Sequence, residues 1–510
     1  MLTMGDESMS AFFTNELILD ILEKYKLIWS LDHSLAALGW DSETYMPEEG
    51  VEERSISVSQ LTLLKQKLLT DPSFISLVDK ASEEKDLNDY EKGVVRVLER
   101  SIKVYRQLPP KLVEELTKTA EEAKVVWRRS RNENSFQTFQ PYLEKIVSLS
   151  REAANHLGYK EHPYDALLDL YEEGLTSRDV DNVFNITVPA TKAVLSRLLE
   201  EKLFPQKHPL EEASYDVEAM KKVNRVVTEK FGYDPKRFRM DISTHPFTIG
   251  LGIRDVRITT RYEGKDFKAS LFSTIHEYGH ALYELQNNEA FISTPLASGV
   301  SLGIHESQSR FWENVIGRSR SFCEAVFPIL KDNLNFISQF TWEDVYYYFN
   351  TVKPSLIRVD SDEVSYNFHI LLRYRLEKGL ISGEINVSDL PELWCNAMDE
   401  YLGIRPKTYS EGVLQDIHWS QASFGYFPTY TLGNIISAQI RHHIIKELPD
   451  FNERVLNMDF TSIKEWLKEK VHRWGSTYTP KMLLEKMFGE ELNPEHFTAY
   501  LREKYLNKKI

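Results

Sequence analysis

The sequence predicts a mainly α-helical protein that also contains one small antiparallel β-sheet. Turn-forming residues are scarce, with 22 glycines and 20 prolines among 510 residues, and this favours long helices over many short strands. Apolar residues recur at helical spacing in three separate segments, residues 15–38, 112–127 and 460–474. Residues 248–262 instead alternate in polarity and are rich in β-branched side chains, which is typical of a pair of short strands.

The first predicted helix, over residues 15–38, shows the helical pattern most plainly. Its apolar positions form one stripe that consists of Leu17, Ile18, Ile21, Leu22, Tyr25 and Ile28. The predicted helices over 112–127 and 460–474 likewise carry charged residues opposite their apolar side. We interpret these charged faces, and the charged run over 83–92, as solvated helix surface.

Charge and cysteine content exclude several classes of protein. The chain has 62 Lys and Arg against 77 Asp and Glu, a formal charge of −15, which does not suit binding to nucleic acid or to an anionic membrane. Two cysteines, Cys323 and Cys395, are too few for a disulfide scaffold or a four-cysteine zinc site. No 18-residue apolar run occurs, and residues 1–24 lack the apolar core of a signal peptide. We therefore expect a soluble cytoplasmic protein.

The domain organisation has no marker in the sequence. Residues 1–510 contain no repeat, no low-complexity tract and no linker rich in Pro, Gly or Ser. Length alone would allow about three domains. Because no boundary is visible, we expect a single unit that could be divided into two lobes.

The strongest chemical signal is the motif His276-Glu277-Tyr278-Gly279-His280, of the form H-E-x-x-H. It lies in a predicted helix over 269–286, where residues i and i+4 stack on one face. His276 and His280 can therefore present two imidazole nitrogens to one cation. Glu277 lies one step round the helix, close to the water that such a cation would activate. A helix with two purely structural histidines is the less specific alternative.

A catalytic zinc ion has three protein ligands and one open position, so a third ligand must come from elsewhere. The next predicted helix begins near residue 300 and has His305 and Glu306 near its start. Glu284, one turn beyond the motif, could instead accept a hydrogen bond from a ligand. The spacing alone does not choose among Glu284, Glu306 and Glu313 as the third ligand.

Further motifs occur in order along the chain. They are His245-Pro246-Phe247, Asp255-Val256-Arg257-Ile258-Thr259, His305-Glu306-Ser307-Gln308, residues 357–362 (IRVDSD) and residues 412–419 (GVLQDIHW). Together with the H-E-x-x-H helix and with residues 40–47 and 164–169, they resemble the carboxypeptidase Taq family of zinc-type metallocarboxypeptidases over nearly the whole chain. Ser361 stands where the family usually has alanine, a small-for-small difference.

The resemblance implies a large helical fold around a deep substrate groove, and a homodimer that removes C-terminal amino acids from peptides with broad specificity. It implies one zinc ion per chain, held by His276, His280 and Glu306, although cobalt or manganese would suit the same ligands. It also implies Glu277 as the catalytic glutamate and Arg358 as the group that binds the terminal carboxylate of the substrate. The catalytic core would cover about residues 240–435.

The remaining motifs are expected to surround the substrate. The resemblance implies that the elements containing His245 and Arg257 close one end of the groove. It also implies that the element containing Gln415, Asp416 and His418 lines the groove. A helix N-cap would explain Asp416 equally well.

Peptide hydrolysis by this route needs a general base, a donor for the developing oxyanion and, for an exopeptidase, a cation that holds the terminal carboxylate. Glu277 is the expected base. The candidate oxyanion donors are His305, His418 and Tyr426, and the residues alone do not rank them. Arginine suits the carboxylate because its planar fork binds both oxygens, and the candidates other than Arg358 are Arg254, Arg257 and Arg261.

Ordinary ion pairs are the alternative interpretation for several of these residues. Asp255 is expected to pair locally with Arg257. Arg358 could likewise pair with Asp360 or Asp362.

Two other functions share part of this pattern. A metallo-oligopeptidase that cuts internal bonds or releases dipeptides would have the same metal-binding helix but would need no carboxylate clamp. A peptide-binding scaffold with a structural metal would need four protein ligands and would give Glu277 no role.

Overall fold

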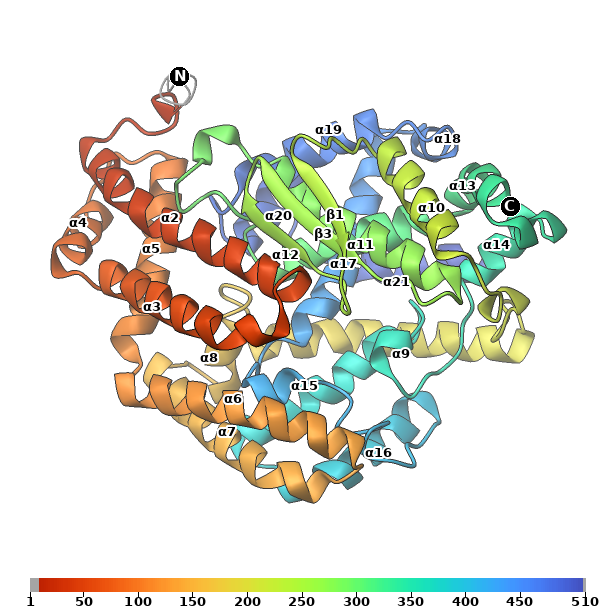
Figure 1. Ribbon diagram of the computed structural model, residues 1–510, viewed down its shortest axis with the longest axis horizontal. Coiled ribbons are helices and arrows are strands. Elements are labelled where there is room, and N and C mark those ends of the chain that lie inside the picture. Colours follow the sequence, from red (N-terminus) through yellow and green to blue (C-terminus); the bar gives the residue numbers. More distant parts are fainter. Residues whose placement is uncertain (1–8, 508–510) are drawn as a thin grey trace. The chain divides into compact units, whose positions relative to one another are not determined.

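The computed structural model describes residues 9–507, and helices form most of that length (Figure 1). The chain divides into two units, each assembled from three separate segments. Unit 1 contains residues 9–106, 209–346 and 440–491, and unit 2 contains residues 107–208, 347–439 and 492–507. The predicted core range of 240–435 therefore includes parts of both units. Within residues 9–507, no helix is both long enough and apolar enough to cross a membrane.

Each unit is mainly helical. The helices of unit 1 are α2 (Glu16–Thr44), α3 (Val51–Leu69), α4 (Pro72–Ser82), α5 (Asp89–Gln107, whose last residue begins unit 2), α10 (Val217–Lys230), α11 (Phe267–Leu285), α12 (Leu302–Arg310), α13 (Arg320–Asn333), α18 (Phe451–Leu456), α19 (Thr461–Lys470) and α20 (Pro480–Phe488). Those of unit 2 are α6 (Pro110–Asn132), α7 (Phe136–Leu157), α8 (Pro163–Leu168), α9 (Ser177–Glu201), α15 (Tyr366–Ser382), α16 (Leu390–Leu402) and α21 (Glu495–Leu506). The chain passes between the units inside α14 (Trp342–Phe349) and α17 (Pro428–Glu447).

The helices predicted from periodicity are present. Asn15 caps α2, which contains the rest of the segment 15–38 and extends to Thr44, and 112–127 lies in α6. Residues 460–474 form α19 followed by one 3₁₀ turn at His472–Trp474. The apolar stripe of α2 is the buried side, because Ile18, Ile21, Leu22 and Ile28 belong to a core cluster shared with α4 and α5.

The interpretation of residues 83–92 as solvated helix surface is only partly confirmed: the charged residues other than Glu91 are exposed, but only residues 89–92 are helical. Helix α4 ends before Glu83 and α5 begins only at Asp89, with a turn between them. Glu91 is buried, and its carboxylate accepts backbone N–H groups of Thr14, Asn15 and Asn88 at 2.8, 2.8 and 3.0 Å. Burial would raise the pKa of Glu91, but these three backbone donors keep that pKa below its usual range. The residue therefore connects the chain before α2 to the start of α5.

The small β-sheet has three strands, in the order β1 (Phe238–Ile242), β3 (Asp255–Thr260) and β2 (Thr248–Gly252). Strands β2 and β3 form the predicted antiparallel pair over 248–262. The sheet as a whole is mixed rather than antiparallel, because β1 lies parallel to β3. Strand β1 was not predicted, although its five residues FRMDI alternate between apolar and polar side chains.

Helix α11 packs beside this sheet in unit 1 (Figure 1). A buried polar cluster joins the two, because the Thr274 hydroxyl of α11 donates to the Thr260 hydroxyl of β3 at 2.9 Å. Asn224 of α10 donates to Thr274 and to Ser270 of α11 at 2.9 and 3.0 Å. These side-chain bonds hold α11 against both the strand and the neighbouring helix, and so restrict its position.

Helices α11 and α12 approach each other very closely. A Cβ atom on Gly279 would lie 2.6 Å from the carbonyl oxygen of Gln308 and 2.7 Å from Cα of Ser309. Only glycine fits at this crossing, because any other side chain would require the backbone of α12 to move. The glycine of the H-E-Y-G-H motif therefore permits the approach that brings α12 to the two histidines.

Candidate metal centre and substrate-binding residues

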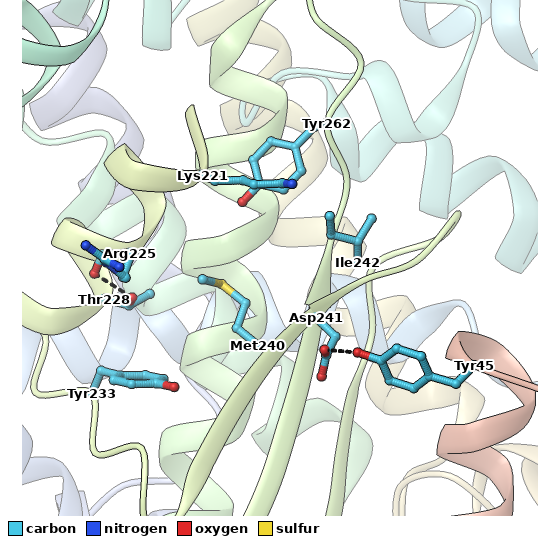
Figure 2. Close-up of a pocket in the computed structure, with 9 residues that line it drawn as sticks. All are labelled: Tyr45, Lys221, Arg225, Thr228, Tyr233, Met240, Asp241, Ile242 and Tyr262. Atoms are coloured by element: carbon cyan, nitrogen blue, oxygen red, sulfur yellow. Dashed lines mark hydrogen bonds between the residues drawn. The ribbon is translucent and has the colours of Figure 1, made fainter. Parts of the chain in front are cut away.

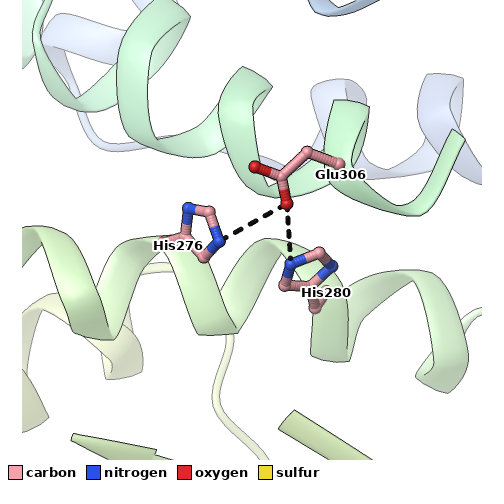
Figure 3. Close-up of side chains that lie close together, drawn as sticks. All are labelled: His276, His280 and Glu306. Atoms are coloured by element: carbon pink, nitrogen blue, oxygen red, sulfur yellow. Dashed lines mark ion pairs between the residues drawn. The ribbon is translucent and has the colours of Figure 1, made fainter. Parts of the chain in front are cut away.

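His276 and His280 on α11 and Glu306 on α12 converge on one point (Figure 3). Ligand atoms of the three side chains all lie within 4.8 Å of one another. The Glu306 Oε2 atom lies 3.7 Å from Nε2 of His276 and 3.4 Å from Nε2 of His280. Glu306 is buried, and the two histidine side chains are only 20 and 16 % exposed.

These separations fit a shared cation better than direct hydrogen bonds. Both exceed the 2.7–3.2 Å range of an N–H···O hydrogen bond. Tetrahedral ligands with bonds of about 2.0–2.1 Å place their donor atoms about 3.3 Å apart. Two imidazoles and one carboxylate are also the donor set of many catalytic zinc sites, so the residues fit a divalent cation.

Glu313, one of the alternative third ligands, lies behind His276. Its Oε2 atom is 2.9 Å from Nδ1 of His276, the nitrogen that faces away from Glu306. Glu313 belongs to a π-helical turn (Phe311–Gly317) that continues α12, and it also pairs with Arg310 and Arg318 at 3.3 and 3.1 Å. A carboxylate in this position fixes the tautomer of a ligating histidine.

The pKa shifts of Glu306 and His280 favour the forms that bind a cation, whereas that of His276 favours its protonated form when no ion is bound. Burial would raise the pKa of Glu306, but Arg310 at 2.7 Å and the two imidazoles hold that pKa well below its usual range. Burial lowers the pKa of His280. Burial also acts downward on His276, but the facing carboxylates, first Glu306 and then Glu313, raise its pKa above the ordinary value. A carboxylate anion and a neutral imidazole are the forms that bind a metal ion.

Glu277 is held by a strand residue. The Thr248 hydroxyl at the start of β2 donates to Oε2 of Glu277 at 2.6 Å and lies 3.0 Å from the Glu277 carbonyl oxygen. This hydrogen bond fixes the Glu277 side chain relative to α11. The residue is also buried, with 8 % of its surface exposed. Its negative charge acts on both imidazoles of the cluster.

His305 and Glu284, two further candidates from the sequence, contact each other. The two Nδ1 atoms of His305 and His280 are 2.7 Å apart, and Nε2 of His305 lies 2.7 Å from Oε1 of Glu284. Both ring nitrogens of His305 are thus engaged within this cluster. The geometry gives His305 no remaining N–H with which to serve as the oxyanion donor.

In unit 2, Arg358 belongs to a buried cluster of charges. Asp416 accepts from Nε of Arg358 at 3.0 Å and from Nε of Arg373 at 2.7 Å. Arg358 Nη1 donates to the Tyr366 hydroxyl at 3.0 Å. Arg358 therefore pairs with Asp416 and not with Asp360 or Asp362, which the sequence offered as its alternative partners. Burial would raise the pKa of Asp416, but Arg373 and then Arg358 keep it well below its usual range.

Gln415 completes this cluster. Its Oε1 atom accepts the backbone N–H of Arg358 at 2.9 Å and an N–H of Arg373 at 2.8 Å. Gln415 and Asp416 thus hold the two arginines. The suggested N-cap role of Asp416 does not apply, because Ile417 is the residue that precedes the 3₁₀ turn His418–Gln421.

His418 and Tyr426 lie near the same cluster. Nε2 of His418 is 3.3 Å from the Tyr430 hydroxyl, and the rings of His418 and Tyr426 are 5.3 Å apart. Burial lowers the pKa of His418 to about 4, so the imidazole is neutral at physiological pH. The Tyr430 ring also lies under the Arg358 guanidinium, 5.0 Å from its centre.

The other candidate arginines are paired in unit 1. Arg257 forms the predicted ion pair with Asp255, with two contacts of 2.8 and 2.7 Å. Arg254 pairs with Glu289 at 2.6 Å, and Arg261 pairs with Glu263 at 2.8 Å. Both of these ion pairs are exposed. His245 is exposed in the segment between β1 and β2.

A separate hollow of about 500 Å³ lies beside α10 and β1 (Figure 2). It is lined by Tyr45, Lys221, Arg225, Thr228, Tyr233, Met240, Asp241, Ile242 and Tyr262. Asp241 accepts a hydrogen bond from Tyr45 and pairs with Arg239. None of the residues that the sequence analysis singled out for the metal or the substrate lines this hollow.

Sequence reasoning missed Thr248, Arg373 and Tyr366. The contact of Thr248 with Glu277 depends on how β2 packs against α11, which has no local signal. Arg373 had a signal that could have been used, since it is a charged residue within the apolar run FHILLRYRL. A cation in such a run is buried and needs a partner.

Comparisons with known proteins identify the family of this chain. The family model of the carboxypeptidase Taq (M32) metallopeptidases matches residues 20–505. "Thermostable carboxypeptidase 1" of Pyrococcus furiosus is 53 % identical over 499 residues, which cover 98 % of this chain and all of that protein. A solved structure of the Pyrococcus furiosus carboxypeptidase superposes with a TM-score of 0.96 over 97 % of this chain and 100 % of that one, at 53 % identity.

A second solved structure, the M32 carboxypeptidase from Deinococcus radiodurans R1, is 34 % identical and superposes with a TM-score of 0.93. It covers 96 % of this chain and 99 % of that one. Matches of this extent, with the H-E-x-x-H helix and Glu306 assembled as described, show that the chain belongs to the carboxypeptidase Taq (M32) family of metallopeptidases.

Proposed function

We propose that this protein is a metallocarboxypeptidase that removes C-terminal residues from peptides with broad specificity, using Glu277 as the general base. The observation that carries the proposal is the convergence of two imidazole Nε2 atoms and the Glu306 carboxylate beside a fixed glutamate. We propose zinc as the ion, one per chain, with cobalt or manganese as ions that the same ligands accept.

His276, His280 and Glu306 would hold the ion. A divalent cation bound there would polarise the scissile carbonyl and would lower the pKa of a water molecule towards about 7. Two neutral imidazoles and one carboxylate leave a net positive charge on such a site, which stabilises negative charge as it develops on the substrate oxygen. Glu313 and His305 keep the two imidazoles oriented from behind.

Glu277 would accept the proton of the attacking water and pass it to the leaving nitrogen. The Thr248 hydroxyl donates to one carboxylate oxygen, so the other oxygen is the one that can take the proton. This hydrogen bond fixes the carboxylate orientation before the substrate arrives, which lowers the cost of reaching the reactive geometry. We propose His418 and Tyr426 as the candidates for additional contact with the developing oxyanion.

Arg358 would bind the terminal carboxylate of the substrate. Arg358 and Arg373 share the single counter-ion Asp416, so this buried trio carries a net charge of +1. An uncompensated buried charge is costly, and a carboxylate anion would neutralise it. Tyr366 accepts a hydrogen bond from the guanidinium, and Gln415 holds the backbone N–H of Arg358. We also propose that His245 and Arg257 lie at one end of a deep groove. A homodimeric assembly and a cytoplasmic location are part of the same proposal.

The test is a comparison of one peptide with its C-terminal amide, after the protein has been reconstituted with zinc. Mass spectrometry should show stepwise loss of single residues from the free acid and no loss from the amide. Glu277→Gln should bind zinc as the wild type does and should lower the rate by about a hundredfold or more. Equal cleavage of acid and amide would overturn the proposed clamp.

A metallo-oligopeptidase is the second candidate. It would give internal fragments or dipeptides from both substrates, and replacement of Arg358 would leave its rates unchanged. The pairing of Arg358 in a cluster of net positive charge favours the carboxypeptidase. A structural metal site would instead show zinc binding without any product that depends on Glu277.

A further inference from the structure

We propose that Glu284 is a positioning residue for the metal site and that it acts on the ligand His280 through His305. This inference rests on the proposed metal centre and concerns how strongly that centre holds its ion. Glu284 does not reach the ligand itself. The connection consists of two short contacts in series, each 2.7 Å long, from Glu284 to His305 and from His305 to His280.

The positions of the protons follow from the metal site. His280 directs Nε2 towards Glu306, so a cation would take the lone pair of Nε2, and the ring proton must then be on Nδ1. Because Nδ1 of His280 donates, Nδ1 of His305 has to accept. The proton of a neutral His305 is then on Nε2, and it is donated to Oε1 of Glu284. A single assignment of the ring protons therefore gives each nitrogen in the two contacts a suitable partner. The last acceptor in the series is the Glu284 carboxylate.

The surrounding structure fixes this arrangement. The Gly299 backbone N–H also points at Oε1 of Glu284, at 3.3 Å. The His305 ring packs on Tyr283, with 5.0 Å between ring centres, and a Cβ on Gly299 would lie 2.7 Å from both rings. The side chains of Glu284 and His305 are only 14 and 21 % exposed. These contacts restrict both rotation and displacement of the His305 ring.

The two ligand histidines are thus supported in different ways. Glu313 contacts His276 directly, whereas Glu284 contacts His280 through a second imidazole. A carboxylate that accepts a hydrogen bond raises the electron-donating power of the ring that donates it, and this effect can pass through His305. We infer that removing the Glu284 charge weakens metal binding although residue 284 lies one helical turn beyond the last ligand on α11.

The experiment measures the zinc dissociation constant of the apo-protein in competition with a chromophoric chelator. Glu284→Gln keeps the size and loses the charge, and it should raise the dissociation constant about tenfold. His305→Phe keeps the packing on Tyr283 and breaks the series, so it should raise the constant by at least as much. His305→Gln, which can still accept and donate a hydrogen bond, should recover part of the affinity. Glu289→Gln, an exposed carboxylate of unit 1, is the control and should leave the constant unchanged.

The double variant separates a connection through His305 from a general effect on folding. If Glu284 acts through His305, Glu284→Gln should cause no further loss once His305 is phenylalanine. Additive losses in the two variants would overturn the proposal, as would an unchanged constant in Glu284→Gln. If the wild type holds zinc tightly and loses it in His276→Gln, the proposed metal centre stands even where the Glu284 result is negative. A wild type that binds no zinc would overturn both.

Discussion

Gly279 of α11 lies against the backbone of Gln308 on α12, so closely that an added Cβ would be 2.6 Å from the carbonyl oxygen of Gln308. This contact sets the distance between the helix that carries both histidines and the helix that carries Glu306. The glycine inside the H-E-x-x-H motif is therefore part of the architecture of the proposed metal site. A larger residue at position 279 should move the two helices apart, and with them the proposed ligands, although no ligand is itself substituted.

We expect Gly279→Ala to weaken zinc binding by at least tenfold and to lower the free energy of unfolding by about 1–3 kcal/mol, the range for an overpacked core. Urea denaturation and zinc titration measure the two effects. Gly39→Ala in α2 is the matched control, because a Cβ there meets nothing within 4 Å. That control should be neutral or stabilising by up to about 1 kcal/mol. Equal behaviour of the two variants would show that the helix crossing is not tight.

Thr248→Val should lower kcat about ten- to a hundredfold, the range for losing a hydrogen bond to a charged group. The zinc affinity should stay unchanged, because Thr248 contacts Glu277 and no ligand. Thr248→Ser keeps the hydroxyl and should retain most of the activity. A valine variant as active as the wild type would mean that the Glu277 carboxylate needs no such support.

Arg358→Lys should raise KM for a peptide with a free C terminus by about tenfold or more, because a lysine ammonium cannot reproduce the fork of the guanidinium. Steady-state kinetics on a series of short peptides give this value. Arg254→Lys is the control, since Arg254 is an exposed residue paired with Glu289. A larger effect on KM from the Arg254 variant than from the Arg358 variant would show that Arg358 is not the residue that binds the terminal carboxylate.

Asp416→Asn should lower the free energy of unfolding by about 3–5 kcal/mol, because it leaves two buried guanidinium groups without a counter-ion. Glu161→Gln breaks an exposed ion pair with Arg178 in the same unit, and it should cost less than about 1 kcal/mol. Urea denaturation compares the two. Similar losses in both variants would show that the Asp416 cluster is accessible to solvent.

His369 should make the protein less stable in acid. Burial lowers the pKa of His369 to about 3, against 6.5 in the unfolded chain. Between these values the unfolded state binds a proton that the folded state does not, so stability falls as the pH drops below 6.5. The loss from this one group is about 1.4 kcal/mol per pH unit.

Unfolding experiments at several pH values test the effect. The difference in unfolding free energy between wild type and His369→Leu should shift in favour of the variant as the pH falls from 6.5 to 4. Parallel profiles for the two proteins would contradict the assignment.

Local patterns predicted most of the residues that form the proposed metal site. The spacing of His276 and His280 follows from the helical repeat, and the resemblance supplied Glu306. The positions of Glu313 and Glu284 behind the ligands could not be predicted, because both depend on the crossing of α11 and α12. A π-helical turn after α12 also shifts Glu313 out of the register of an ordinary helix.

Charge patterns in the sequence were less reliable for predicting burial and ion pairs. The run over 83–92 suggested exposure, yet Glu91 is buried because three backbone N–H groups converge on it. Arg358 has two aspartates close by in sequence, yet its partner is Asp416, 58 residues away. Ion pairs between distant segments are set by the tertiary fold and leave no periodic signal in the sequence.

The interleaving of the two units has a consequence for synthesis on the ribosome. Each unit needs a final segment that begins at or after residue 440, whereas the proposed metal ligands lie between residues 276 and 306. His472, in the last segment of unit 1, has Nδ1 at 2.7 Å from Oε1 of Gln286 and Nε2 at 2.8 Å from Oε1 of Gln308, beside those residues. A nascent chain therefore carries the three proposed ligands long before it can enclose them. The order of translation thus delays maturation of the enzyme until its C-terminal segments emerge.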